Sequence, residues 1–90
     1  MSNTLPVTIY TQPGCRPCAR VKSLFMANGI GLEVVDITEN EDARTYVVEV
    51  LRASSVPVVV TDDFDPVVGY QPEMYQPIID HYRNEDTDGS

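Results

Sequence analysis

Two cysteines in the stretch YTQPGCRPCARV (residues 10–21) are the side chains of this chain that are best suited to chemistry. A thiolate can attack a disulfide sulfur to form a mixed disulfide, and a second thiol nearby can then resolve it. If a helix begins at Cys15, Cys18 lies one turn later on the same face, so its sulfur can reach that of Cys15. The pair therefore predicts thiol–disulfide exchange, with Cys15 attacking and Cys18 resolving.

The predicted helix start favours a reactive Cys15. The first N–H groups of a helix have no partner within it, and its dipole is positive there, so a thiolate is stabilised. This should lower the pKa of Cys15 below the usual value of about 8.5. Pro17 stiffens the first turn, while Cys18 falls on the apolar face of the helix and should be less exposed. Three basic side chains could support the thiolate or contact a partner, although a solvated helix face explains Lys22 equally well: Arg16, Arg20 and Lys22.

A metal site and a structural disulfide stay open as alternatives. A structural zinc site needs four ligands, and beyond the cysteines the chain offers only His81. A site shared by two molecules, such as a bridging iron–sulfur cluster, would not need His81. A structural disulfide closing so short a loop would restrain the unfolded chain little. Redox chemistry is the favoured interpretation, and no bound metal is expected.

Length and charge limit the other function classes. Ninety residues make one domain with one modest core, and the net charge is −8. Residues 1–32 contain three basic and no acidic residues, whereas residues 33–90 contain three basic and all fourteen acidic ones. Such an acidic chain disfavours nucleic-acid binding. No apolar run could span a membrane and no secretory signal is recognisable, so we expect a cytoplasmic protein. We expect a domain over residues 1–83 and a disordered acidic tail over 84–90.

Periodicity predicts the elements that position the cysteines, in the order βαβ-α-ββ-α. The expected strands are 7–11, 32–37, 56–60 with Pro57 at its start, and a short one around 67–68. The expected helices are 15–28, ended by Gly29, then 38–53, started by a capping box of Thr38 and Glu41, and a last one from 71 or 72. Because a βαβ unit makes parallel strands, we expect an α/β fold with a small four-stranded mixed sheet flanked by three helices.

Apolar stripes predict the buried faces of the second and third helices. In the second helix the stripe comprises Ala43, Tyr46, Val47, Val50 and Leu51. In the third it comprises Met74, Tyr75, Ile78, Ile79 and Tyr82. Pro77 predicts a kink or a late start of that last helix.

Pro57 has two interpretations. It could simply open a strand near a sheet edge, where a missing N–H does least harm. Alternatively, the Val56–Pro57 bond is cis and turns the backbone of Val56 toward the sulfurs, where a substrate peptide could pair with it like an added strand.

Three segments together resemble a known family: YTQPGCRPC, SSVPVVV and VVGYQP. The chain resembles the glutaredoxins, which have a thioredoxin-like fold, and most closely the NrdH-type redoxins, from about Val7 to Tyr82. The resemblance implies that Cys15 is the nucleophile and Cys18 the resolving thiol. It also implies a cis-proline substrate loop at Val56–Pro57, and an active-site loop shaped by Tyr10 and Pro13.

The NrdH-type resemblance further implies an electron carrier that is reduced by NADPH-dependent thioredoxin reductase. Such a protein reduces protein disulfides and passes electrons to the large subunit of class Ib ribonucleotide reductase, for deoxyribonucleotide synthesis. No tightly bound cofactor is implied, because the redox-active Cys15–Cys18 disulfide carries the electrons and NADPH acts only through the reductase. We expect a monomer.

The segment VVGYQP bears on the electron source. Glutaredoxins that use glutathione carry a Gly-Gly pair and an acidic residue here, whereas this chain has a single Gly69 followed by Tyr70, which favours the reductase. Gly69 and Tyr70 form either a turn with a core aromatic or the rim of a partner groove. The chain also departs from the NrdH pattern in two places. The NrdH-type redoxins often have Lys where this chain has Gln12, and they typically have Trp-Ser-Gly-Phe-Arg-Pro where this chain has VVGYQP. A glutathione-dependent glutaredoxin is therefore the alternative.

Overall fold

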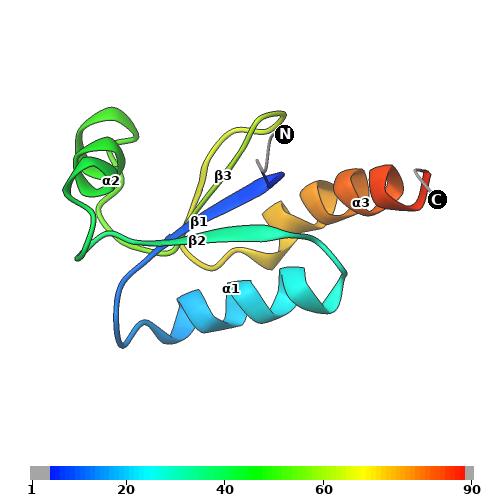
Figure 1. The fold of residues 1–90 in the computed structure, drawn as a ribbon, viewed down its shortest axis with the longest axis horizontal. Coiled ribbons are helices and arrows are strands. Elements are labelled where there is room, and N and C mark those ends of the chain that lie inside the picture. Colours follow the sequence, from blue (N-terminus) through cyan, green and yellow to red (C-terminus); the bar gives the residue numbers. More distant parts are fainter. Residues whose placement is uncertain (1–4, 89–90) are drawn as a thin grey trace.

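The structure is a computed structural model that describes residues 5–88 (Figure 1). It confirms a four-stranded mixed sheet with helices on both faces. The strands are β1 (Val7–Thr11), β2 (Leu32–Asp36), β3 (Val58–Thr61) and β4 (Val67–Val68). The helices are α1 (Arg16–Ala27), α2 (Glu41–Thr45), which continues into the π-helical turn η1 (Tyr46–Val50), and α3 (Pro72–Asp88). No helix in this part of the chain is long and apolar enough to cross a membrane.

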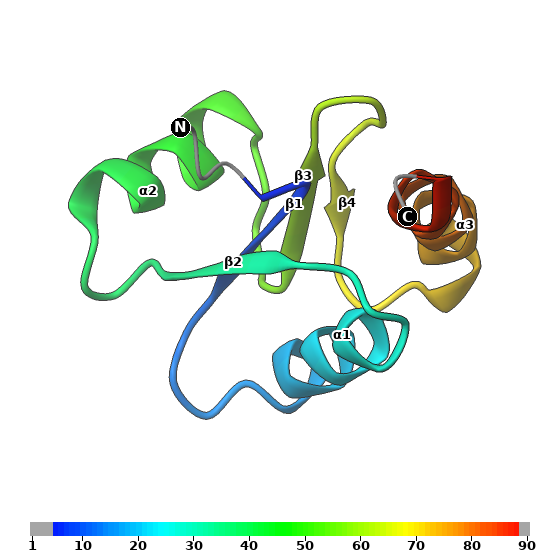
Figure 2. The ribbon, with the colours of Figure 1, turned by 45° about the vertical axis from the view of Figure 1, so that its right-hand side comes forward.

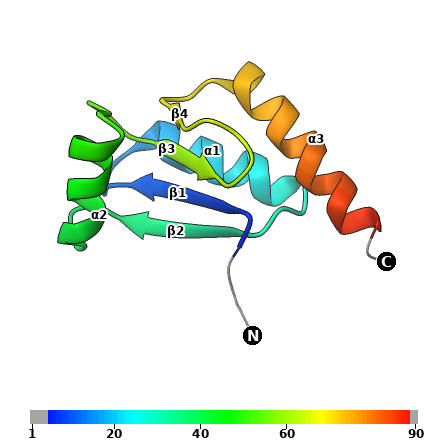
Figure 3. The ribbon, with the colours of Figure 1, turned by 90° about the horizontal axis from the view of Figure 1, so that it is seen from above.

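The sheet order β2-β1-β3-β4 brings three chain segments to one end of the sheet. β1 and β2 are parallel, with Val7 opposite Leu32, so both strands end at the same edge. β3 is antiparallel to β1 and therefore begins where β1 ends. Figure 3 shows β1 and β2 pointing toward the end of the sheet where α2 lies. The loop after β1 and the segment before β3 consequently meet beside α2.

Alternating residues of β1, β3 and β4 fill two hydrophobic clusters, one on each face of the sheet. Helices α1 and α3 cover one face and α2 covers the other (Figure 2). Val7, Ile9 and Val59 belong to the cluster under α1 and α3. Val58 belongs to the cluster under α2, with Tyr10 packed against it. The valine run of β3 thus alternates between the faces, as its pleat requires.

Helix α1 begins and ends where the sequence predicts. Cys15 is its N-cap, and Gly29, which follows the C-cap residue, has a φ of +75°. The N–H of Ile30 donates to the carbonyl oxygen of Phe25 at 3.1 Å, and that of Gly29 to Met26 at 3.0 Å, which is the Schellman pattern. The turn therefore leads directly into β2.

The predicted capping box of the second helix is wrong. Asn40 is the N-cap, and its Oδ1 accepts from the N–H of Ala43 at 3.0 Å. Thr38 instead donates its N–H and its hydroxyl to Oδ1 of Asp36, at 2.8 and 2.6 Å. The hydroxyl of Thr38 is thus engaged in a turn at the end of β2, and the helix begins at Glu41.

The predicted apolar stripes hold except at two positions. The second helix changes to π geometry at Tyr46, which adds residues to the turn and shifts the stripe, so Val50 is 64% exposed. Met74, in the first turn of α3, is also exposed. The third strand differs as well, because β3 begins at Val58 and Pro57 precedes it.

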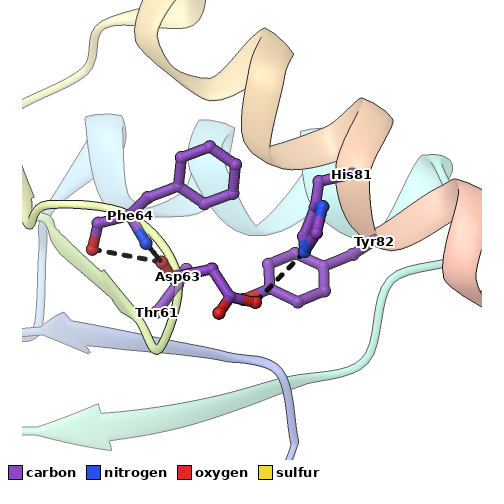
Figure 4. Close-up of polar contacts among 5 residues, drawn as sticks. All are labelled: Thr61, Asp63, Phe64, His81 and Tyr82. Atoms are coloured by element: carbon purple, nitrogen blue, oxygen red, sulfur yellow. Dashed lines mark hydrogen bonds and ion pairs between the residues drawn. The ribbon is translucent and has the colours of Figure 1, made fainter.

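Helix α3 contacts the β3–β4 turn at the end of the sheet away from α2. Oδ2 of Asp63 lies 3.1 Å from Nε2 of His81 and accepts from the hydroxyl of Tyr82 at 3.3 Å (Figure 4). Phe64 packs edge-on against the ring of His81. The helix contains Pro77 and continues to Asp88, past the predicted domain boundary at residue 83. The end of the predicted tail, 89–90, lies outside the described residues.

Candidate functional site

The two cysteines lie where β1 leads into α1. Strand β1 ends at Thr11, and Gly14, with a φ of +77°, turns the chain into the helix. Cys15 then occupies the N-cap position, and Pro17 lies in the first helical turn. Sγ of Cys15 accepts the backbone N–H of Cys18 at 3.1 Å. The predicted contact between the sulfur of Cys15 and a free N–H group at the helix start is thus present.

Cys15 and Cys18 form a disulfide in this structure, with their Cα atoms 5.2 Å apart. The Cys18 side chain is 2% exposed and belongs to the core, whereas Cys15 is partly exposed. An incoming reactant can therefore approach the sulfur of Cys15 but not that of Cys18. The first turn of α1 contains no acidic residue that would oppose a thiolate.

A groove of about 810 Å³ opens beside Cys15. One side is formed by the active-site loop and the start of α1: Gln12, Gly14, Cys15, Arg16 and Pro17. The other is formed by the end of β2, by α2 with η1, and by the segment before β3: Ile37, Arg44, Val47, Val48 and residues 53–56. The partly exposed sulfur of Cys15 can thus be reached from this groove.

The Val56–Pro57 bond is cis, as one of the two sequence-based interpretations predicts. Val56 lines the groove, and Pro57 is buried behind it. Val56 makes no backbone hydrogen bond with a described residue. The groove is therefore lined in part by a backbone segment that is not paired with another described residue.

The Gly69–Tyr70 turn lies against the other side of α1. The N–H of Gly69, with a φ of +86°, donates to the carbonyl oxygen of Pro57 at 2.7 Å. The hydroxyl of Tyr75 donates to the carbonyl oxygen of Gly69. The guanidinium of Arg20 lies 5.8 Å from the centre of the Tyr70 ring, which is 38% exposed. A shallow surface hollow joins Tyr70 to α1. Gly69 is thus a turn residue tied to Pro57, and Tyr70 lies at the surface.

Two predicted loop-shaping residues do not line the groove. Tyr10 points to the face of the sheet that α2 covers, where its ring packs 5.9 Å from that of Tyr46. Burial, with smaller contributions from Tyr46 and Glu33, raises the pKa of Tyr10 above its usual value. Pro13 is an exposed turn residue next to the loop. Tyr10 thus supports the sheet behind the loop.

The second helix contributes groove residues that the sequence did not predict, above all Arg44 and Val48. Arg44 is the only basic residue of 33–51. This isolated charge is the sole signal in the sequence that could have indicated Arg44 as a site residue. Its position opposite Cys15 follows from packing between segments distant in the sequence. Among the described residues, no three His, Cys, Asp or Glu side chains are grouped as a metal would require.

Comparison with known proteins agrees with this geometry. The glutaredoxin family matches residues 7–64. The "Gene 56 protein" of Mycobacterium phage D29 is 54% identical over 82 residues, which are 91% of each chain. The solved thioredoxin-like protein BC3987 has a TM-score of 0.74 at 33% identity, over 80% of this chain and 97% of that one. The NrdH-redoxin of Escherichia coli has a TM-score of 0.72 at 24% identity, over 80% of this chain and 92% of its own.

These similarities confirm the thioredoxin-like fold. The family match spans β1, α1, β2, α2 and β3, and thus includes the cysteine pair and the cis proline. With its C-x-x-C pair at disulfide distance at the start of a helix, the chain belongs to the glutaredoxin family.

Proposed function

We propose that this glutaredoxin-like redox protein is a dithiol electron carrier that reduces protein disulfides. The observation that carries the proposal is the contrast between the two sulfurs, since Cys15 opens onto the groove and Cys18 is 2% exposed. The accessible sulfur can meet a substrate, and the shielded one can meet only Cys15.

The reaction proceeds by two exchanges. The Cys15 thiolate attacks one sulfur of the substrate disulfide, a mixed disulfide forms, and the other substrate sulfur leaves as a thiolate that takes up a proton. Cys18 then loses its proton and attacks Sγ of Cys15, which releases the second substrate thiol. Two electrons have passed to the substrate, and the protein holds the Cys15–Cys18 disulfide seen in this structure.

For the return of electrons we propose thioredoxin reductase, with NADPH as the indirect source. The Gly69–Tyr70 turn supports this choice, because it contains a single glycine and carries the Tyr70 ring beside Arg20 where glutathione-using relatives have a glycine pair. The E. coli NrdH-redoxin, whose fold this chain shares, is described as a glutaredoxin-like protein with a thioredoxin-like activity profile. We further propose, on the NrdH-type resemblance, that a monomer acts in the cytoplasm as electron donor to the large subunit of class Ib ribonucleotide reductase.

One observation favours a second candidate, the glutathione-dependent glutaredoxin. Arg16 and Arg44 line the groove and could bind the carboxylates of glutathione.

The test follows NADPH consumption during insulin reduction with either thioredoxin reductase or glutathione plus glutathione reductase. We expect rapid consumption only with thioredoxin reductase, and none with Cys15→Ser. Turnover only with glutathione would replace the first proposal by the second. Full activity of Cys15→Ser would exclude dithiol chemistry altogether.

A further inference from the structure

The groove beside Cys15 carries positive charge and no acidic side chain. None of its thirteen lining residues is Asp or Glu, although the chain contains fourteen acidic residues. Arg16 contributes its charge from α1 and Arg44 from α2. The sign of the groove is therefore opposite to the net charge of −8.

Neither arginine has a partner in the described part of the chain. The ion pair found there joins His81 to Asp63 at the far end of the sheet. The side chains of Arg16 and Arg44 are exposed and make no hydrogen bond with a described residue. The guanidinium groups of the two arginines that line the groove are thus available to an external carboxylate.

The other lining groups indicate what else the ligand must offer. Ile37, Val47 and Ala53 give the groove an apolar wall, which Val48, 50% exposed, extends to the surface. Val56 adds a backbone segment that makes no backbone hydrogen bond with another residue of 5–88. A free anion would use neither feature, whereas an extended peptide would use both.

We infer that the preferred substrate is an acidic, extended peptide segment that carries the target disulfide. Its backbone pairs with Val56, and its acidic side chains near the cysteines meet Arg16 and Arg44. This inference rests on the proposed function, because the bound segment must present its disulfide to Cys15. The exchange is the one described above: the Cys15–Cys18 dithiol is oxidised, and the peptide disulfide becomes two thiols.

The charge distribution of the whole chain sharpens this selectivity. Exposed acidic residues lie outside the groove, among them Asp62, Asp63 and Asp65 between β3 and β4. An acidic segment is repelled there and attracted at the groove, which directs it to Cys15.

The test compares two peptides, each closed by an internal disulfide and identical except that the cysteines are flanked by Glu or by Gln. The pre-reduced protein is mixed with each peptide, and the rate of peptide thiol formation is measured in a single turnover, so that no electron source is involved. We expect the Glu peptide to react about fivefold faster at low salt, and the difference to shrink toward unity at high salt, because exposed charges are screened. Equal rates at low salt would overturn the inference while leaving the proposed function intact.

Two matched arginine variants test whether the preference for the Glu peptide arises in the groove. Arg44→Gln should remove most of the preference for the Glu peptide, measured as the ratio of the rates with the two peptides. Arg83→Gln removes the same charge at the opposite end of α1, where Arg83 contacts Asn28, and should retain the preference. If Arg83→Gln lowers the preference as much as Arg44→Gln, net charge and not the groove is responsible, and the inference fails.

Glutathione is the competing occupant. The same variants are therefore assayed with a mixed disulfide of glutathione and a small thiol. If Arg44→Gln slows only that substrate and the two peptides react equally, the groove binds glutathione and the inference is overturned. If neither peptide is reduced at all, the proposed function falls as well.

Discussion

The two sulfurs differ in burial because they occupy different positions of one helix start. As N-cap, Cys15 lies outside the helical repeat at the mouth of the groove. Cys18 lies one turn later, on the face shared with Val21 and Phe25, which are fully buried. The same helix thus supplies one accessible and one protected sulfur, and their division of labour follows from helical spacing.

Removing the resolving sulfur should trap the substrate. In Cys18→Ala the mixed disulfide between Cys15 and the substrate forms but cannot be resolved internally. Intact-mass spectrometry after mixing with excess oxidised peptide should show nearly complete addition of one peptide chain. Cys15→Ala is the control and should remain free of adduct, because Cys18 is buried. Comparable adducts on both variants would show that Cys18 is accessible, contrary to the assignment.

At the level of elements, local signals in the sequence were sufficient where one segment determines its own structure. The turn at Gly29 and the cysteine spacing are of this kind, and the predicted start and end of α1 agree with the structure. The second helix could not be predicted as well. Thr38 and Asn40 are both good N-caps, and the choice depends on Asp36, which engages Thr38. The shift to π geometry and the position of Arg44 opposite Cys15 depend on packing between distant segments.

The choice of cap can be measured. Asn40→Ala removes the acceptor for the N–H of Ala43 and should lower the free energy of unfolding by about 1 kcal/mol. Thr38→Ala, the matched change at the other candidate cap, should cost less than about 0.5 kcal/mol, because its hydroxyl bond is exposed. Urea unfolding followed by circular dichroism gives both values. A larger loss for Thr38→Ala would mean that the capping box predicted from the sequence forms in solution.

At the scale of the whole molecule, three tyrosines make the free energy of unfolding depend on pH. Burial is the largest cause that raises the pKa of each above its usual value: Tyr10, Tyr75 and Tyr82. Smaller contributions come from neighbouring groups, such as Asp63 beside Tyr82. Tyr10 lies on β1, and the other two lie on α3. These rings therefore pack in the hydrophobic clusters on both faces of the sheet.

A raised pKa in the folded state means that the folded protein keeps the phenolic proton at a pH where the unfolded chain has lost it. The stabilisation by these tyrosines is therefore complete below about pH 10 and is lost as pH rises through the folded-state values. Urea unfolding of the oxidised protein at pH 8, 9, 10 and 11 should show a constant free energy up to about pH 9. Above pH 10 it should fall, by at most about 1.4 kcal/mol per pH unit for each tyrosine.

Tyr75→Phe removes one titrating group and should make this fall less steep. It should also cost about 1 kcal/mol at pH 8, because the hydrogen bond to Gly69 is lost. A slope identical to that of the unaltered protein would show that Tyr75 does not take part in the alkaline loss of stability.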